Sequence, residues 1–274
     1  MSSSNNPSVS RTLLFVPGDR PERFQKAAAS GAHEIILDLE DAVAPAAKDA
    51  ARGCVDQSLA EGGKAIVRIN GADTAWYADD IAMLKRHAGA TAMLPKAESA
   101  SVARTAALLP GRRLIALVET VAGYMELREV AGSPGVERIA FGSVDFSGES
   151  GIVDEGEALT SVRAAIVLAS CHAGLHPPID GVSLEFNDLA RMTEDALRSR
   201  QLGFGGKLCI HPRQVAAVNA AFMPSQAERE WAQRVLNAFE TSGGAATAVD
   251  GKMIDKPVVE RARRIAAATS PTAA

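Results

Sequence analysis

The chain has 274 residues, of which 33 are acidic and 29 are basic, and its formal net charge at pH 7 is −4. Hydrophobic residues make up 47% and charged residues 23% of the chain, which excludes a disordered, collagen-like or disulfide-rich protein. Its cysteines, Cys54, Cys171 and Cys209, form no CxxC pair, so a zinc ribbon or dithiol redox site is not expected. The slight acidity gives no reason to expect a nucleic-acid partner.

The N-terminal sequence MSSSNNPSVS is polar and lacks the basic and then apolar pattern of a signal peptide. No apolar run approaches the ~18 residues that a membrane span requires. We therefore expect a cytoplasmic protein without a membrane partner, in which residues 1–10 form a flexible arm.

Short apolar runs alternate with longer Ala-rich segments along most of the chain. Near-continuous apolarity over about four to eight residues is typical of buried parallel strands. In chain order, the predicted strands are Thr12–Pro17, Glu34–Glu40, Ala65–Asn70, Thr91–Ala97, Arg113–Thr120, Arg138–Asp145, Ile179–Leu184 and Lys207–Pro212.

The segments between these strands have helical character. Thr74, Ser99 and Asp188 are candidate N-caps, because their side chains can accept hydrogen bonds from free amides of a first helical turn. The predicted helices are Pro21–Gly31, Ala46–Glu61, Thr74–His87, Ser99–Leu109, Ala122–Val130, Glu157–His172, Asp188–Leu202 and Arg213–Phe222.

Eight strand–helix units predict an α/β fold, a (β/α)8 TIM barrel over residues 11–224. The alternative, an open doubly wound sheet, is disfavoured because the turn after the first strand, Pro17–Pro21 (PGDRP), lacks the glycine spacing of a pyrophosphate site. Residues 225–274 are predicted to form a C-terminal helical extension. It contains a helix over Ser225–Thr241, a break at Gly243 and Gly244, and a last helix around Pro257–Ala268, and we expect it to contact a neighbouring subunit.

Charged residues end several of the predicted strands, where the active site of a TIM barrel lies. Period-2 alternation places Arg68, Glu119 and Asp145 on the same strand faces as apolar residues, and we expect all three to face the barrel mouth. Two carboxylates without a cysteine or histidine pair suit Mg²⁺. They also suit a glycosidase acid–base pair, but an arginine beside them favours an anionic ligand.

Three other residues have structural interpretations that we prefer. Lys96 is expected to pair with an acidic neighbour and not to form a Schiff base. His211, before Pro212, is expected to make a backbone hydrogen bond, and Cys209 is expected to be a small core residue.

Seven motifs stand in order along the chain, and together they resemble the citrate lyase beta-subunit-like family within the HpcH/HpaI aldolase and citrate lyase superfamily. The C-terminal segment Gly251–Pro257 (GKMIDKP) looks like that of the malyl-CoA and citramalyl-CoA lyases. The motifs are RTLLFVPGDRP (11–21), DLEDAV (38–43), VRIN (67–70), LPKAE (94–98), VET (118–120), FGSVDF (141–146) and GGKLCIHP (205–212).

The resemblance implies a lyase that uses Mg²⁺, or Mn²⁺ in its place, to make or break a carbon–carbon bond in a β-hydroxyacyl thioester. The products would be an acetyl thioester and a 2-oxo acid, and the acyl carrier would be coenzyme A or a carrier protein. Two alternative hypotheses remain. The chain could be a 2-oxo-acid aldolase that acts on free acids without coenzyme A, or a non-catalytic barrel that binds an acyl thioester.

The resemblance also assigns roles to residues. It makes Glu119 and Asp145 the metal ligands, and it makes Arg68 a catalytic residue that contacts the substrate together with Glu119. Asp255 would be a catalytic aspartate contributed by a neighbouring subunit of a homotrimer or hexamer. Glu40 and Asp41 are expected to orient metal-bound water, and Arg20 and Lys26 are weaker candidates for binding the phosphates of coenzyme A.

Overall fold

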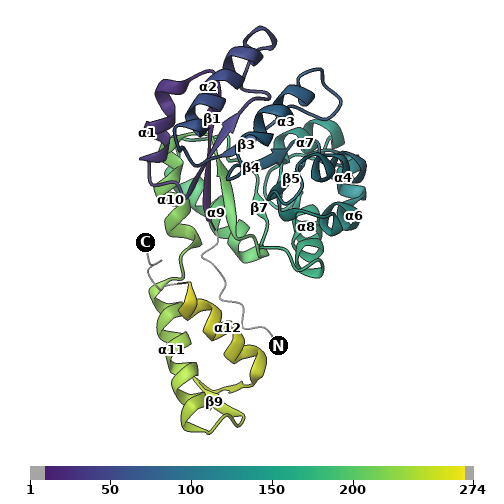
Figure 1. Ribbon diagram of the computed structural model, residues 1–274. Coiled ribbons are helices and arrows are strands. Elements are labelled where there is room, and N and C mark those ends of the chain that lie inside the picture. The colour runs from purple at the N-terminus through teal and green to yellow at the C-terminus, as the bar shows by residue number, and fades with distance from the viewer. Residues whose placement is uncertain (1–9, 269–274) are drawn as a thin grey trace. The chain divides into compact units, whose positions relative to one another are not determined.

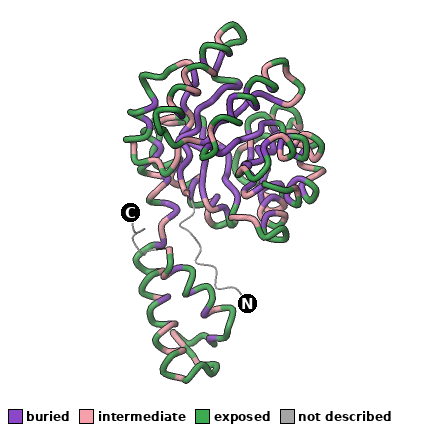
Figure 2. Tube along the Cα trace, viewed as in Figure 1, coloured by how far each residue is buried: buried purple, intermediate pink, exposed green. Residues whose placement is uncertain are grey.

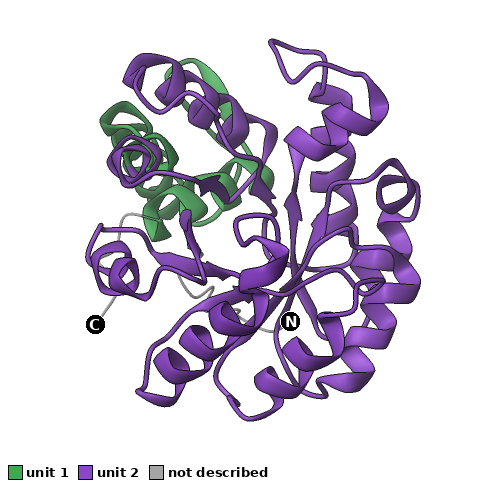
Figure 3. Ribbon diagram, turned by 90° about the horizontal axis from the view of Figure 1, so that it is seen from above, with its two compact units in different colours: residues 1–8, 220–274 green, residues 9–219 purple. Residues whose placement is uncertain are grey.

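A computed structural model describes residues 10–268 of the chain. Of the predicted N-terminal arm, residues 1–9 lie outside the described residues. The chain divides into two compact units, Val9–Asn219 and a second one that contains Ala220–Ala274 (Figure 3). None of the described helices is long and apolar enough to cross a membrane.

The first unit is built around a closed barrel of eight parallel strands in the order β1 to β8 (Figure 1). The predicted TIM barrel is confirmed, although most strands end two to four residues earlier than predicted. The strands are β1 Thr12–Pro17, β2 Glu34–Asp38, β3 Ile66–Arg68, β4 Thr91–Leu94, β5 Leu114–Val118, β6 Val136–Phe141, β7 Ile179–Asp180 and β8 Gly206–Cys209.

Helices follow the strands at nearly all the predicted places. Asp188 is confirmed as an N-cap, because its side chain accepts from the backbone N–H of Arg191. The helices of this unit are α1 Phe24–Ala28, α2 Lys48–Ala60, α3 Tyr77–Lys85, α4 Ser99–Leu108, α5 Val121–Met125, α6 Leu127–Gly132, α7 Ser143–Ser150, α8 Thr160–His172, α9 Leu189–Leu202 and α10 Pro212–Phe222, with short 3-10 turns η1 Pro21–Arg23 and η2 Pro45–Ala47.

Every strand of the barrel contributes an apolar side chain to one interior cluster, and Figure 2 shows burial following the strands. Because side chains alternate along a strand, the members of this cluster show which polar residues at the strand ends face inward. The cluster consists of Leu13, Ile36, Ile66, Met93, Ile115, Leu117, Ala140, Ile179 and Leu208.

The alternation confirms two of the three predicted directions. Arg68 lies two residues beyond Ile66, and Glu119 lies two beyond Leu117, so both continue inward-facing columns. The prediction that Asp145 continues an inward-facing column of its strand was wrong. In β6 the inward residue is Ala140, while the Phe141 ring packs edge to face on Phe146 at 5.6 Å, and the strand ends before Asp145.

The second unit contains α11 Gln226–Thr241, a hairpin of β9 Thr247–Val249 and β10 Lys252–Ile254, and α12 Lys256–Ala267. The predicted helix over Ser225–Thr241 is present as α11, and an apolar stripe along it, which includes Val235, packs against α12. Gly243 and Gly244 have φ of 64° and 86° and donate backbone hydrogen bonds to the last turn of α11. They therefore form the turn that ends the helix and leads into the hairpin.

Candidate active site

Arg68 and Asp38 form a buried, two-pronged ion pair at the ends of β3 and β2. The two residues are register partners in the sheet, and Arg68 Nε and Nη2 donate to the Asp38 carboxylate at 2.7 Å and 2.6 Å. Asp38 also accepts the backbone N–H groups of Glu40 and Ala42. The guanidinium lies 4.8 Å from the ring centroid of Phe15. Asp38 therefore fixes the orientation of Arg68 within the barrel mouth.

Glu40 and Asp41 follow β2 and lie on the other side of the same guanidinium. Arg68 Nη1 is 2.9 Å from Glu40 Oε2 and 3.7 Å from Asp41 Oδ2. Lys96 Nζ lies 3.7 Å from Glu40 Oε1, which confirms the predicted acidic partner of this lysine. Lys48 Nζ donates to the backbone carbonyls of Leu39 and Glu40 at 2.7 Å and so holds the loop after β2 in place.

Glu119 is 2% exposed and lies directly after β5. Its Oε1 accepts the backbone N–H of Lys96 at 2.8 Å, and Lys96 adopts the left-handed conformation, with φ of 46°. Such a conformation is costly for a residue with a side chain and is typical of functional sites. A Cβ on Gly142 would lie 2.4 Å from Glu119 Cβ, so glycine is required there for Glu119 to keep its place.

Asp145 approaches the same region from a different element, the first turn of α7. It is exposed, and its charge is among those that raise the pKa values of Glu119 and Lys96, which places it near both. The structure thus brings Arg68, Glu119, Asp145, Glu40 and Asp41 to one end of the barrel, as predicted.

The site holds more carboxyl groups than basic groups. Burial raises the pKa of Glu119 to about 8, and the neighbouring Glu40 contributes to this rise; burial likewise raises the pKa of Glu40 to about 7. Five carboxyl groups face three basic groups here, so protons or a bound cation must balance the excess of carboxyl groups. The carboxyl groups belong to Asp38, Glu40, Asp41, Glu119 and Asp145, and the basic groups to Lys48, Arg68 and Lys96.

A hard divalent cation fits this donor set. The site offers carboxylate oxygens, which Mg²⁺ prefers, and the carboxyl groups of Asp38, Glu40 and Glu119 are buried. Glu119 and Asp145 are the carboxylates not occupied by Arg68. In the described part of the chain no three His, Cys, Asp or Glu side chains group closely enough to hold a metal. Water or substrate oxygens would therefore complete the coordination of an ion held by two protein ligands.

The remaining predicted residues belong to other elements of the chain. Arg20 lies between β1 and α1, Lys26 lies in α1, and both are exposed. Asp255 belongs to the second unit, where it is the N-cap of α12 and its Oδ1 lies 3.4 Å from the backbone N of Val258. Its carboxylate is exposed.

The sequence analysis did not select Asp38, although it is the residue that positions Arg68. The same alternation would have found it, because Asp38 lies two residues beyond the inward-facing Ile36. His211 accepts the backbone N–H of Arg213 through Nδ1, as expected for a structural residue, and Cys209 is fully buried.

Comparison with known proteins identifies similar sequences and structures over almost the whole chain. A family model described as HpcH/HpaI aldolase/citrate lyase matches residues 11–212, and one described as a C–C bond lyase of the TIM-barrel fold matches residues 170–270. A citrate lyase subunit beta-like protein of Mycobacterium tuberculosis is 40% identical over 94% of this chain and 96% of its own length. A (3S)-malyl-CoA thioesterase of Cereibacter sphaeroides is 35% identical over 96% of both chains.

Among solved structures, protein CitE from Mycobacterium tuberculosis in complex with magnesium, acetoacetate and coenzyme A superposes with a TM-score of 0.83. The superposition covers 96% of this chain and 99% of that one, at 36% sequence identity.

Proposed function

We infer that this chain, which belongs to the HpcH/HpaI aldolase/citrate lyase family and is a carbon–carbon lyase, acts on a β-hydroxyacyl thioester with the help of Mg²⁺. The reaction is the reversible cleavage of a malyl-, citramalyl- or citryl-type thioester to an acetyl thioester and a 2-oxo acid. The observation that carries this proposal is the excess of carboxyl groups around Glu119 at the barrel mouth, beside a firmly positioned arginine. The ligands of the CitE structure, magnesium, acetoacetate and coenzyme A, support the same chemistry.

In the cleavage direction, the hydroxyl group of the substrate loses its proton and becomes the carbonyl of the 2-oxo acid. The bond from that carbon to the neighbouring CH₂ breaks, and the CH₂ carbon takes up a proton to become the methyl group of the acetyl thioester. When bound, Mg²⁺ would supply the Lewis acidity that stabilises the negative charge on the substrate oxygen.

The chain's own residues have separate tasks. Glu119 and Asp145 hold the ion, and the N–H groups of Arg68 that Asp38 does not engage bind the carboxylate or developing oxyanion of the substrate. Glu40 and Asp41 orient water beside the ion. Since Arg68 is held on both sides, by Asp38 and by Glu40, little of its freedom is lost when substrate binds.

Asp255 is proposed to deliver or remove the proton on the thioester methyl carbon from a neighbouring subunit of a closed trimer or hexamer. Asp255→Ala should then bind metal and substrate but turn over poorly. Mixing it with Arg68→Ala under conditions that exchange subunits should restore part of the activity, because mixed interfaces pair an intact mouth with an intact Asp255. A fully active monomer, or mixtures that stay inactive despite exchange, would exclude this arrangement.

Arg20 and Lys26 are proposed to bind phosphates of coenzyme A, and both are exposed as such a role requires. The function as a whole is tested by offering malyl-, methylmalyl-, citramalyl- and citryl-thioesters with Mg²⁺ and measuring cleavage. One of them should be cleaved, and the activity should vanish in excess chelator. Full activity in excess chelator would contradict the proposed metal dependence.

A further inference from the structure

Glu149 of α7 connects the two elements that carry the proposed metal ligands Glu119 and Asp145. Its Oε2 accepts the backbone N–H of Val121 at 3.0 Å. Val121 is the first residue of α5 and lies two residues beyond Glu119. Amides of a first helical turn have no partner within their own helix, so a side chain from another element can bind one of them. The bond therefore joins the helix of one ligand to the chain segment of the other.

The spacing along these two elements is matched. Asp145 and Glu149 are four residues apart on α7, so they share a helix face and are separated by a rise of about 6 Å. Glu119 and Val121 are two residues apart, and Thr120 between them is extended, with φ of −116° and ψ of 155°. Two residues of extended chain span about 7 Å. The contact of Glu149 with Val121 therefore leaves Asp145 one helical turn away, on the side toward the other ligand.

Two further contacts hold the start of α7 against β5 and α5. The backbone N–H of Gly142 donates to the carbonyl of Val118 at 2.9 Å, immediately before the helix begins. Phe146 is buried, and its ring packs edge to face on Tyr124 of α5, with ring centroids 5.7 Å apart. These contacts fix the first turn of α7, whereas the second turn is fixed by Glu149.

The helix itself contributes little to the position of Asp145. α7 has eight residues, among them three serines and a glycine, which are weak helix formers. Helices this short are marginal on their own and depend on packing against other elements. The buried residues of α7 are Ser143 and Phe146. The position of Asp145 therefore depends on the contacts that α7 makes with its neighbours.

We propose, building on the metal site proposed above, that Glu149 is a positioning residue for Mg²⁺ binding. It sets the separation between Asp145 and Glu119 by binding the Val121 amide, and it does not itself contact the ion. Contacts that orient metal ligands from outside are commonly worth about 10- to 100-fold in metal affinity. We expect the lower end of that range, because the contact is exposed and the packing of Phe146 remains.

The test is Mg²⁺ binding to the full chain, measured by titration calorimetry. Glu149→Ala should raise the Kd about tenfold, whereas Glu149→Gln, whose amide oxygen still reaches the Val121 N–H, should stay within about threefold of wild type. Glu149→Asp keeps the charge but is one methylene shorter, so it should resemble Glu149→Ala. If Glu149→Asp keeps wild-type affinity and Glu149→Gln loses it, Glu149 acts through its charge and the proposal fails.

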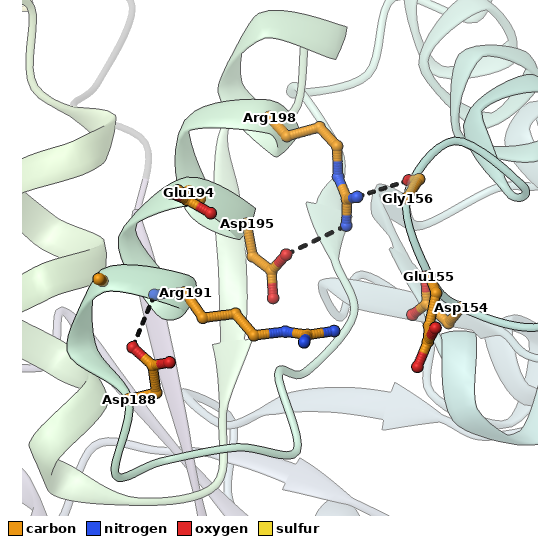
Figure 4. Close-up of a pocket in the computed structure, with 9 residues that line it drawn as sticks. Asp154, Glu155, Gly156, Asp188, Arg191, Glu194, Asp195 and Arg198 are labelled. Atoms are coloured by element: carbon orange, nitrogen blue, oxygen red, sulfur yellow. Dashed lines mark hydrogen bonds and ion pairs between the residues drawn. The ribbon is translucent and has the colours of Figure 1, made fainter.

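Asp188→Ala is the matched control, because Asp188 makes the same kind of bond on another helix. Its Oδ1 accepts the backbone N–H of Arg191 in the first turn of α9 at 3.0 Å. Figure 4 shows this contact beside a hollow of about 420 Å³, which neither Glu119 nor Asp145 lines. Asp188→Ala should lower the midpoint of urea unfolding about as much as Glu149→Ala does, and it should leave the Kd of Mg²⁺ unchanged.

An unchanged Kd in Glu149→Ala, or an equal loss of affinity in Asp188→Ala, would overturn the proposal. Thioester cleavage by the wild type together with an unchanged Kd in Glu149→Ala would leave the proposed function standing without this role. Mg²⁺ binding that depends on Glu149, without cleavage of any thioester, would support the positioning role and overturn the proposed reaction. If the wild type binds no Mg²⁺, the metal site and the positioning role both fail.

Discussion

Asp38→Asn removes the charge that holds Arg68 and changes little else in the shape of the site. The Asp38 carboxylate is 1% exposed and the Arg68 side chain 11%, and their two contacts measure 2.6 Å and 2.7 Å. Breaking such a pair from one side leaves a buried charge uncompensated, which costs about 3–5 kcal/mol. Glu40 and Asp41 still face the guanidinium, so we expect a loss of about 3 kcal/mol of barrel stability, the lower end of that range.

The assay is urea unfolding at pH 7, followed by tryptophan fluorescence in a Trp231→Phe background. Trp76 then reports on the barrel alone, since it and Trp231 are the chain's two tryptophans. Asp56→Asn is the control, because the Asp56 carboxylate, which contacts Arg86 and His87, is 34% exposed, and a surface pair of this kind should be worth at most about 1 kcal/mol.

A second variant, Arg68→Met, allows the interaction energy between Asp38 and Arg68 to be measured apart from their other contacts. In a double-mutant cycle with Asp38→Asn, the two residues should show a coupling of about 2–3 kcal/mol. If Asp38→Asn costs no more than Asp56→Asn, or the coupling is below about 0.5 kcal/mol, the pair does not anchor the site as argued.

Three further outcomes follow from the packing and the charges. Burial alone would raise the pKa of Asp180, but the charges of Lys207 and Arg163 outweigh burial and hold this pKa below its ordinary value. The interaction of Asp180 with these two cations therefore stabilises the barrel above about pH 4, and this stabilisation is lost as the pH falls. In urea unfolding, Asp180→Asn should therefore be less stable than wild type at pH 7 and lose less stability between pH 5 and pH 3. Gly142→Ala should displace Glu119 and weaken Mg²⁺ binding about 10- to 100-fold in calorimetry, with the fold retained by circular dichroism. Burial raises the pKa of Cys209 to about 12, so mass spectrometry should find it alkylated by iodoacetamide only after unfolding.

The barrel was predictable because eight short apolar runs, typical of strands buried on both faces, alternate with helical segments. Strand ends were less predictable, since beyond β3 the backbone N–H of Asn70 donates to the Asp80 side chain and not to a neighbouring strand, which the sequence pattern does not show. The second unit was also visible in the sequence, through the apolar stripe of α11 and the glycines that end that helix.

The positions of the candidate site residues were predictable only in part. Alternation correctly directed Arg68 and Glu119 inward, because both continue regular strands. It failed for Asp145, since β6 ends at Phe141 and α7 begins two residues later. The sequence of α7, SVDFSGES, gave little sign of that helix, because three serines and one glycine among its eight residues are weak helix formers.

The contacts between individual side chains could not be predicted from the sequence, for a different reason. The engagement of Arg68 by Asp38 depends on the register between β2 and β3, and the neighbouring pKa values depend on burial. Neither quantity is encoded in any single segment. The same holds for the contact of Glu149 with Val121, which joins two elements that lie far apart in the chain.

The most direct test of the central claim is the product balance of thioester cleavage with Mg²⁺. The enzyme should release a 2-oxo acid and an acetyl thioester in equal amounts from one of the β-hydroxyacyl thioesters, without free coenzyme A thiol. Asp145→Asn and Glu119→Gln should keep the fold and lose this activity. Release of the free thiol without a 2-oxo acid would identify a thioesterase, and wild-type turnover that survives both substitutions would contradict the proposed site.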